Sequence, residues 1–416
     1  MPDAVNSSEQ FVYEVCQKSF LSLWSYVNPQ GRISGKELCD ILIVCDPHVI
    51  VISVKEVKLG NSGEPFVDWH RWQRKAIEAS KKQITGAVRL LNDVQVVVTK
   101  DGKQGLPLPI QERRVYHRIA VAFGGHREVP IACSRSKDEP FVHILDESSF
   151  FLLLRHLDTI SDFVQYLTDK NELLARCAIT VEGGEENLLA IYLHGGRKFP
   201  AGPDMLNIQD GLWKNVSSKP EFIAKLERDC DSYVWDRLIE SFCEDGFEGD
   251  SWLGPGMEET EKALRVLAQE NRFSRRILGR GFKDFLEQSK ARKTCSRCMQ
   301  SHSNVVYVFF TYRSNSTLEA RKNELLGRCL ASLCRFPHVS TVIGIDINVP
   351  GELPRYGYSS DLVMLYTDGE WPEEYLEKAR FFRNKLGFFK NPNEAEIRED
   401  EYPIEPQPIF KGKKTK

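Results

Sequence analysis

The stretch GKELCDILIVCDPHVIVISVK, residues 35–55, decides the fold of the N-terminal part of the chain. It holds two runs rich in apolar and β-branched residues, Ile41–Cys45 and Val49–Lys55, around the turn signal DPH at 46–48. Two such runs joined by a tight turn predict a β-hairpin. Because apolar residues follow one another without alternation, we expect strands buried on both faces, as in a sheet covered by helices.

The flanking segments extend this prediction to a layered unit. Residues 8–27 and 67–92 carry apolar residues at helical spacing, and residues 94–99 and 118–123 have the composition of strands. The resulting order is helix, strand, strand, helix, strand, strand. We therefore expect a three-layer α/β unit.

The hairpin also gathers polar side chains. Asp40 starts the first strand, while Ser53 and Lys55 end its antiparallel neighbour and share one face because they are two residues apart. Phosphodiester hydrolysis uses such a group. A carboxylate holds a divalent cation, the cation lowers the pKa of a bound water, and a lysine offsets charge on the phosphate.

This pattern resembles the core of the PD-(D/E)xK nucleases, the restriction-endonuclease-like superfamily, over about residues 8–123. Asp40 matches the first acid of the motif and Lys55 matches its lysine. The resemblance implies a nuclease that depends on Mg²⁺ or Mn²⁺ and acts on nucleic acid, on DNA rather than RNA. The segment is also similar to nuclease-like proteins of bacterial and phage-defence contexts, which would imply a role in antiviral defence.

Ser53 departs from the motif because it stands where the second acid belongs. Glu37, or the helix residue Glu14, would then complete the metal ligands around Asp40. On the following helix Gln83 is a candidate, since related exonucleases place a glutamine there that faces the metal; the alternative is an exposed polar residue.

A second register remains open. Residues 56–58 read Glu-Val-Lys and have the full acid-x-Lys form, but Glu56 would face away from Lys55. Two other interpretations compete with the enzyme. One is an inactive nuclease-like protein that binds nucleic acid or serves in assembly, which Ser53 favours. The other is a regulatory α/β protein in which Asp40 and Lys55 form a plain buried ion pair.

Charge and composition narrow the classes of function. The net charge of −3 excludes a globally basic nucleic-acid binder, yet residues 68–128 hold 12 basic and 6 acidic residues, an excess of +6 that suits phosphates or a solvated helix face. No apolar run reaches the ~18–20 residues of a membrane helix. The 11 cysteines, an odd number, indicate buried thiols in a reducing compartment, and with no secretory signal at the N-terminus we expect a cytoplasmic protein.

The length of 416 residues predicts two or three domains. We expect an overall α/β protein with a nuclease-like domain at 1–130, a mainly helical middle domain at 131–300, a smaller C-terminal α/β domain at 301–390, and a tail at 391–416. Within the middle region, residues 188–194 resemble a strand and residues 289–304 a polar linker. A homo-oligomer or a partner protein stays open.

Other motifs are weaker. Cys295 and Cys298 form one CxxC pair near His302, without the second pair that a zinc site needs. No Gly-rich phosphate loop is present. A basic cluster predicts either a solvated helix face or a contact with nucleic acid or a partner. It consists of Arg272, Arg275, Arg276 and Arg280.

Overall fold

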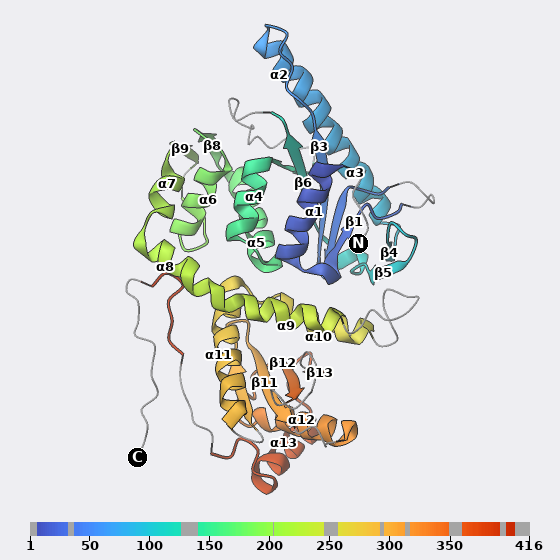
Figure 1. Cartoon of the computed structure of the whole chain (residues 1–416), viewed down its shortest axis with the longest axis vertical. Coiled ribbons are helices and arrows are strands. Elements are labelled where there is room, and N and C mark those ends of the chain that lie inside the picture. The colour runs from blue at the N-terminus through green and yellow to red at the C-terminus, as the bar shows by residue number, and fades with distance from the viewer. Residues whose placement is uncertain are drawn as a thin grey trace. The chain divides into compact units, whose positions relative to one another are not determined.

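The computed structural model describes residues 6–31, 37–125, 140–202, 204–244, 257–291, 295–312, 317–348, 360–391 and 397–403 (Figure 1). The chain is of the α/β class, as the sequence predicts. Its residues divide into two compact units. Unit 1 comprises Met1–Ile223 and Cys243–Glu258, and unit 2 comprises Ala224–Phe242 and Glu259–Lys416.

A five-stranded mixed sheet lies at the centre of unit 1. Its strands follow the order β1-β2-β3-β6-β7, antiparallel from β1 to β3 and parallel from β3 to β7. Residues 41–45 and 49–54 are buried throughout, because the sheet is covered on both faces. The strands are β1 (Ser25–Val27), β2 (Ile41–Cys45), β3 (His48–Glu56), β6 (Val115–Phe123) and β7 (His143–Asp146).

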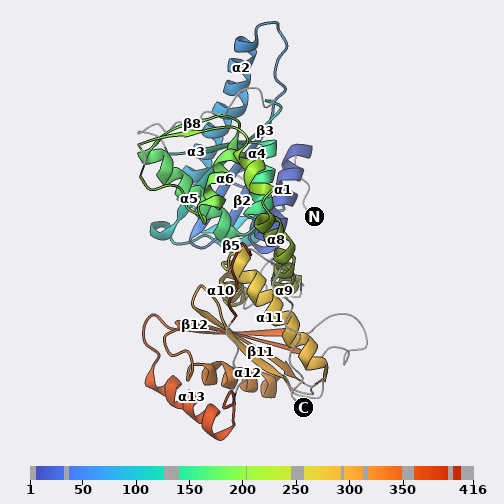
Figure 2. The same cartoon turned by 90° about the vertical axis from the view of Figure 1, so that its left-hand side faces the viewer.

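Helices cover the two faces of this sheet. On one face α1 (Ser7–Phe20) packs with its Ser8 hydroxyl donating to the Glu56 carboxylate. On the other face α3 (Ala79–Leu91) brings Gln83 to Ser53. Ser53 and Glu56 point to opposite faces because successive side chains of a strand alternate. Figures 1 and 2 show α1 and α3 on either side of the strands, which gives three layers.

The long helix expected at 67–92 is interrupted by one π-helical turn. The segment consists of α2 (Pro65–Gln73), the turn η2 (Arg74–Glu78) and α3. Trp72 anchors it, since its indole Nε1 donates to the carbonyl of Val57 at 2.8 Å and its ring packs on Ala76 and Ala122. A two-stranded sheet of β4 (Val96–Val98) and β5 (Gln104–Pro107), followed by η3 (Gln111–Arg113), leads from α3 to β6.

The rest of unit 1 is mainly helical, and here one prediction is wrong. Residues 188–194 belong to helix α6 (Glu185–His194) and not to a strand. Leu188, Leu189 and Leu193 are all buried. A short helix that is apolar around most of its circumference has no clear period. The other elements are η1 (Ser22–Trp24), α4 (Glu147–His156), α5 (Ile160–Arg176), β8 (Ala178–Val181), β9 (Met205–Ile208) and α7 (Leu212–Ser217), with α8 (Pro220–Asp229) at the border of the units.

Unit 2 combines helices with a four-stranded sheet of order β10-β11-β12-β13. The strands are β10 (Ser296–Gln300), β11 (Val305–Tyr312), β12 (Thr341–Asn348) and β13 (Ser360–Tyr366). The helices are η4 (Cys230–Ser232), α9 (Tyr233–Glu244), α10 (Met257–Ala268), α11 (Arg272–Ala291), α12 (Leu318–Ser332) and α13 (Glu373–Lys385). The polar linker expected at 289–304 is wrong in part, because β10 pairs with β11 and Cys298 packs against the core.

This division differs from the three domains expected. The boundary at residue 130 lies outside the described residues, and β7 extends the N-terminal sheet beyond it by pairing with Ile119–Ala122 of β6. The middle region 131–300 is shared between the two units near residue 223. Most of the tail from 391 also lies outside the described residues. Within the described ranges, no helix combines the length and apolar character needed to cross a membrane.

Candidate active site

Asp40 sits directly before β2 and is buried, with 3% of its surface exposed. The β2–β3 register pairs Ile41 with Ile52, so the residue before β2 lies beside Ser53 and Val54. The Val54 amide donates to Asp40 Oδ2 at 2.5 Å. The strand register therefore places Asp40 beside Ser53, and the hydrogen bond from the Val54 amide holds its carboxylate there.

Gln83 links the helix layer to this carboxylate. Its Nε2 donates to Asp40 Oδ1 at 2.7 Å, and its Oε1 accepts from the Ser53 hydroxyl at 3.0 Å. The side chain reaches the sheet because Ser80, Ile84 and the rest of the inner stripe of α3 are buried against it. Gln83 is thus placed at the Asp40 carboxylate, and not on the outer face of its helix.

Lys55 completes the group and opens it to solvent. Its Nζ lies 3.6 Å from Asp40 Oδ2, and 32% of the Lys55 side chain is exposed against 4% for Asp40. At this distance the two groups form an ion pair, and both can reach one water molecule at the open side of the group. The structure therefore brings together four of the expected residues, namely Asp40, Ser53, Lys55 and Gln83, which we call the Asp40 cluster.

Two expected acids do not join the Asp40 cluster. Glu37 is exposed in an isolated bridge with Gln30. Glu14 is exposed on the outer side of α1, where it accepts a hydrogen bond from Gln10, because α1 buries a different stripe against the Glu56 face. Within the described part of the chain, no three His, Cys, Asp or Glu side chains gather in a way that holds a metal. The expected carboxylate shell of Asp40, Glu37 and Glu14 is not formed.

The alternative match to the motif, at residues 56–58, does not contribute to the Asp40 cluster. Glu56 faces α1, where its carboxylate accepts from Ser8 at 2.5 Å. Lys58 is exposed beyond the end of β3. The strand thus presents Ser53 and Lys55 to Asp40, as the period of two predicts.

The oxygens of the Asp40 cluster are the hard donors that Mg²⁺ prefers: a carboxylate, a hydroxyl and an amide oxygen. The charge is less favourable, because Asp40 contributes −1 and Lys55 contributes +1. A divalent cation therefore fits these residues when one further anionic oxygen comes with it. A phosphodiester supplies such an oxygen.

A row of three histidines on the same sheet escaped the sequence reasoning; His117 and His143 are buried and His48 is partly buried. His48 Nδ1 lies 3.1 Å from His117 Nε2 across β3 and β6, and His143 follows on β7. Burial, His48 and Arg118 lower the pKa of His117 to about 3. Burial, Lys170 and His117 lower the pKa of His143 as well. The three histidines lie far apart in the sequence, so only strand pairing reveals the row.

Three of the four arginines of the α11 cluster are buried, and the fourth, Arg280, is 38% exposed and pairs with Glu399 at 2.6 Å. Arg272, Arg275 and Arg276 are at most 2% exposed. Arg272 and Arg275 share the Asp236 carboxylate, at 2.8 and 2.6 Å. These arginines form neither a solvated face nor a nucleic-acid contact, because buried carboxylates of unit 2 already neutralise them.

Unit 2 holds a second polar group, around Asp346. This residue is fully buried on β12, where it accepts from the Asp361 amide at 2.8 Å and from Arg321 Nε at 3.3 Å. Arg321 also pairs with the Asp361 carboxylate at 2.6 Å. Burial raises the pKa of Asp346, although Arg321 acts against it. Two acids and one arginine form a closed ion-pair network here.

Comparisons with known proteins were made for the whole chain. No family model matches it, and neither a curated protein nor a solved structure matches it significantly.

Proposed function

We propose that unit 1 is a metal-dependent nuclease of the PD-(D/E)xK plan, with the Asp40 cluster as its active centre. The observation that carries the proposal is the 3.6 Å approach of Lys55 Nζ to Asp40 Oδ2 at the end of a buried hairpin. The order of elements supports it: a helix, a hairpin with an acid and a lysine, a second helix with Gln83, and a parallel strand.

In this proposal Asp40 and the oxygens of Ser53 and Gln83 hold the cation. The bound cation would polarise the phosphate and lower the pKa of a water. Lys55 is partly exposed, so its ammonium can contact the scissile phosphate and offset the negative charge that develops there. Gln83 positions Asp40, because its amide donates to one carboxylate oxygen and leaves the other toward Lys55.

The charge of the Asp40 cluster implies that the binding of the divalent cation and the binding of nucleic acid are coupled. Without nucleic acid the charges of Asp40 and Lys55 cancel, so the affinity for a divalent cation should be low. The phosphodiester adds the missing negative charge, and Mg²⁺ commonly uses substrate phosphates as ligands. We therefore expect nucleic acid to raise the affinity for Mg²⁺ or Mn²⁺, and the metal to raise the affinity for nucleic acid equally.

A second candidate function is nucleic-acid binding without hydrolysis. It is favoured by Ser53 at the place of the second acid and by the saturation of Asp40, whose two oxygens accept from Gln83 and Val54. In that case Asp40 is a structural anchor for the hairpin, and the affinity for nucleic acid would not depend on a divalent metal.

A cleavage assay distinguishes the two. The full chain is incubated with labelled single- and double-stranded DNA and RNA in Mg²⁺ or Mn²⁺. We expect cleavage of DNA, and a loss of roughly 100-fold or more in Asp40→Asn and Lys55→Gln, as for other groups that act on transition-state charge. Glu14→Gln and Glu56→Gln are the matched acid controls and should cleave like the wild type.

Ser53→Asp adds a further test, because it places the second acid of the motif at this position, where the larger carboxylate replaces a buried hydroxyl. The nuclease proposal expects this variant to bind Mg²⁺ more tightly without nucleic acid. Undiminished cleavage by Asp40→Asn would contradict the proposal. Absence of cleavage by the wild type, together with metal-independent binding of DNA, would establish the second candidate.

A further inference from the structure

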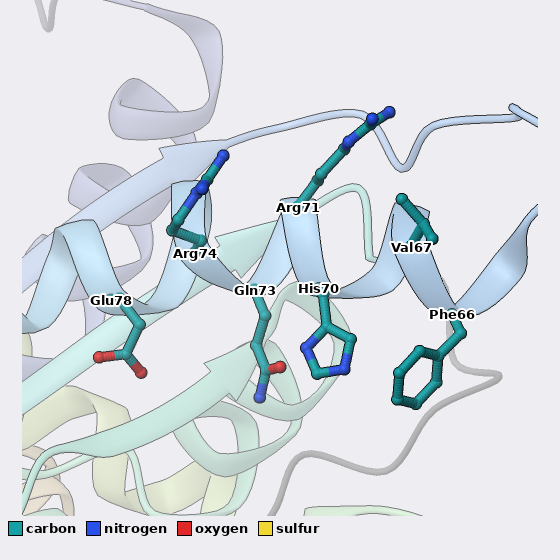
Figure 3. Close-up of a pocket in the computed structure, with 7 residues that line it drawn as sticks. All are labelled: Phe66, Val67, His70, Arg71, Gln73, Arg74 and Glu78. Atoms are coloured by element: carbon teal, nitrogen blue, oxygen red, sulfur yellow. The ribbon is translucent and has the colours of Figure 1, made fainter.

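Helix α2 exposes an unusual combination of side chains. Phe66 is 72% exposed and Val67 is 40% exposed at its beginning, and Phe66 packs edge-on against His70 at 4.3 Å between ring centroids. These residues, with Arg71 and Arg74, lie around an open hollow (Figure 3). We call Phe66, Val67, His70, Arg71 and Arg74 the α2 surface.

The cations of this region are largely uncompensated. Arg71, Arg74, Lys75 and Lys82 are exposed, and none of them forms an ion pair with a carboxylate of the described residues. The acid in the neighbourhood, Glu78, pairs with Lys81 at 3.0 Å. The other acid of α2, Asp68, is buried and accepts from the Ser62 amide. The outer face of α2 therefore carries net positive charge.

The aromatic and the cationic side chains lie on different sides of the helix. Figure 3 shows Phe66 and His70 pointing to one side, together with Glu78, and Arg71 and Arg74 pointing to the other, together with Val67. A single nucleic-acid strand has the same division, with flat bases on one side of its backbone and phosphates on the other. In a duplex the base faces are already stacked and closed to an aromatic side chain.

The α2 surface is also held in place before any ligand binds. Trp72 donates to the Val57 carbonyl, and Asp68 ties the start of α2 to the loop at 60–63. In Figure 1, α2 extends beyond the end of the sheet, and residues 57–64 connect it to the end of β3. Pre-organised aromatic and cationic groups lose little conformational entropy on binding.

We propose that the α2 surface binds single-stranded nucleic acid, with a base stacked on Phe66 beside the edge-on ring of His70 and the adjacent phosphates on Arg71 and Arg74. This inference rests on the proposed function, because it names the form of nucleic acid that would be led toward the Asp40 cluster. It makes a separate claim, since binding at α2 requires neither the metal nor hydrolysis.

The test measures binding of the full chain to a fluorescein-labelled 20-nucleotide oligo(dT) by anisotropy, in EDTA so that no cleavage occurs. Phe66→Ala should weaken binding roughly tenfold, and Phe66→Trp should retain it, because stacking tolerates any aromatic ring. Arg71→Ala and Arg74→Ala should each lower the slope of log K against log salt by about 0.7, the contribution of one phosphate contact to a single strand.

Matched controls lie elsewhere on unit 1. Ile110 is 62% exposed, and Arg113 is exposed near Asp46, so Ile110→Ala and Arg113→Ala remove an apolar and a cationic side chain away from α2. Both should bind like the wild type. A 20-base-pair duplex of random sequence should bind more weakly than oligo(dT), and its affinity should not respond to Phe66→Ala.

Equal binding of oligo(dT) by the wild type and Phe66→Ala would overturn the inference. So would tighter binding of the duplex, or a protein that binds no oligonucleotide at low salt. Binding at α2 without any cleavage in Mg²⁺ would support the inference and contradict only the nuclease. Cleavage that is unaffected by the α2 variants, with equal affinities, would contradict only the inference.

Discussion

At the scale of single residues, Asp40 shows how the fold accommodates a buried charge. Its carboxylate has a main-chain donor in Val54, an amide donor in Gln83 and an ammonium group at 3.6 Å in Lys55. A buried charge is tolerated when it is paired and hydrogen-bonded, and removing one partner is costly. Gln83 is the partner whose loss can be tested without changing the charge of the protein.

Gln83→Leu should destabilise unit 1 by about 1–3 kcal/mol, because the buried Asp40 carboxylate loses the donor of its Oδ1. Urea unfolding followed by circular dichroism measures the change. The control is Gln10→Leu, which breaks the same kind of amide–carboxylate bond to Glu14 on the exposed face of α1. It should cost less than about 0.5 kcal/mol. Equal losses in both variants would show that the Asp40 cluster gains nothing from burial.

At the scale of elements, the parallel strands β3, β6 and β7 create a pH-sensitive row from His48, His117 and His143. All three have a pKa below the ordinary value of histidine, chiefly because burial disfavours the charged ring. The unfolded chain therefore binds more protons than the folded chain between about pH 3 and 6.5. In that window the free energy of unfolding must rise with pH, and the full contribution is present above about 6.5.

When the pH is lowered from about 7.5 to about 5, the depressed pKa of His117 alone should reduce the free energy of unfolding by about 2 kcal/mol. Chemical denaturation at both values measures this difference. In His117→Gln the difference should shrink by a similar amount, because glutamine does not titrate and can still hydrogen-bond to His48. A pH dependence that is unchanged in this variant would place the responsible groups elsewhere.

At the scale of the whole molecule, the chain forms two compact units. Unit 2 depends on buried ion pairs between α9 and α11. There Asp236 serves both Arg272 and Arg275, whose charges outweigh the effect of burial and lower the pKa of Asp236. Leaving a buried guanidinium without its carboxylate costs about 3–5 kcal/mol.

Asp236→Asn should therefore lower the stability of unit 2 by about 3 kcal/mol or more and leave that of unit 1 unchanged. Differential scanning calorimetry of the full chain should record two transitions, of which one moves. Asp231→Asn is the control, because its ion pair with Lys283 is 41% exposed on both sides and should be worth less than about 1 kcal/mol. In the double variant Asp236→Asn, Gln83→Leu, the losses of stability measured for the two single variants should add. A single transition that moves with either variant would contradict the independence of the units.

Local patterns in the sequence were enough to predict part of this structure. The apolar runs around 46–48 predict the hairpin because strand, turn and burial signals agree within 21 residues. The period of two then places Ser53 and Lys55 on one face and Glu56 on the other, as the contacts to Gln83 and Ser8 confirm. The α/β class follows from the alternation of helical and strand patterns.

Other features depend on partners that lie far away in the sequence. Glu14 is excluded from the Asp40 cluster because packing selects which stripe of α1 is buried, and a single helix does not reveal that choice. The arginines at 272–276 resemble a solvated face until Asp229 and Asp236 are brought beside them. The sequence by itself determined the hairpin and its turn, since those preferences are local. Only the tertiary structure decided which charges are neutralised, which histidines meet and which cations of α2 remain exposed, because electrostatics and burial depend on distances in space.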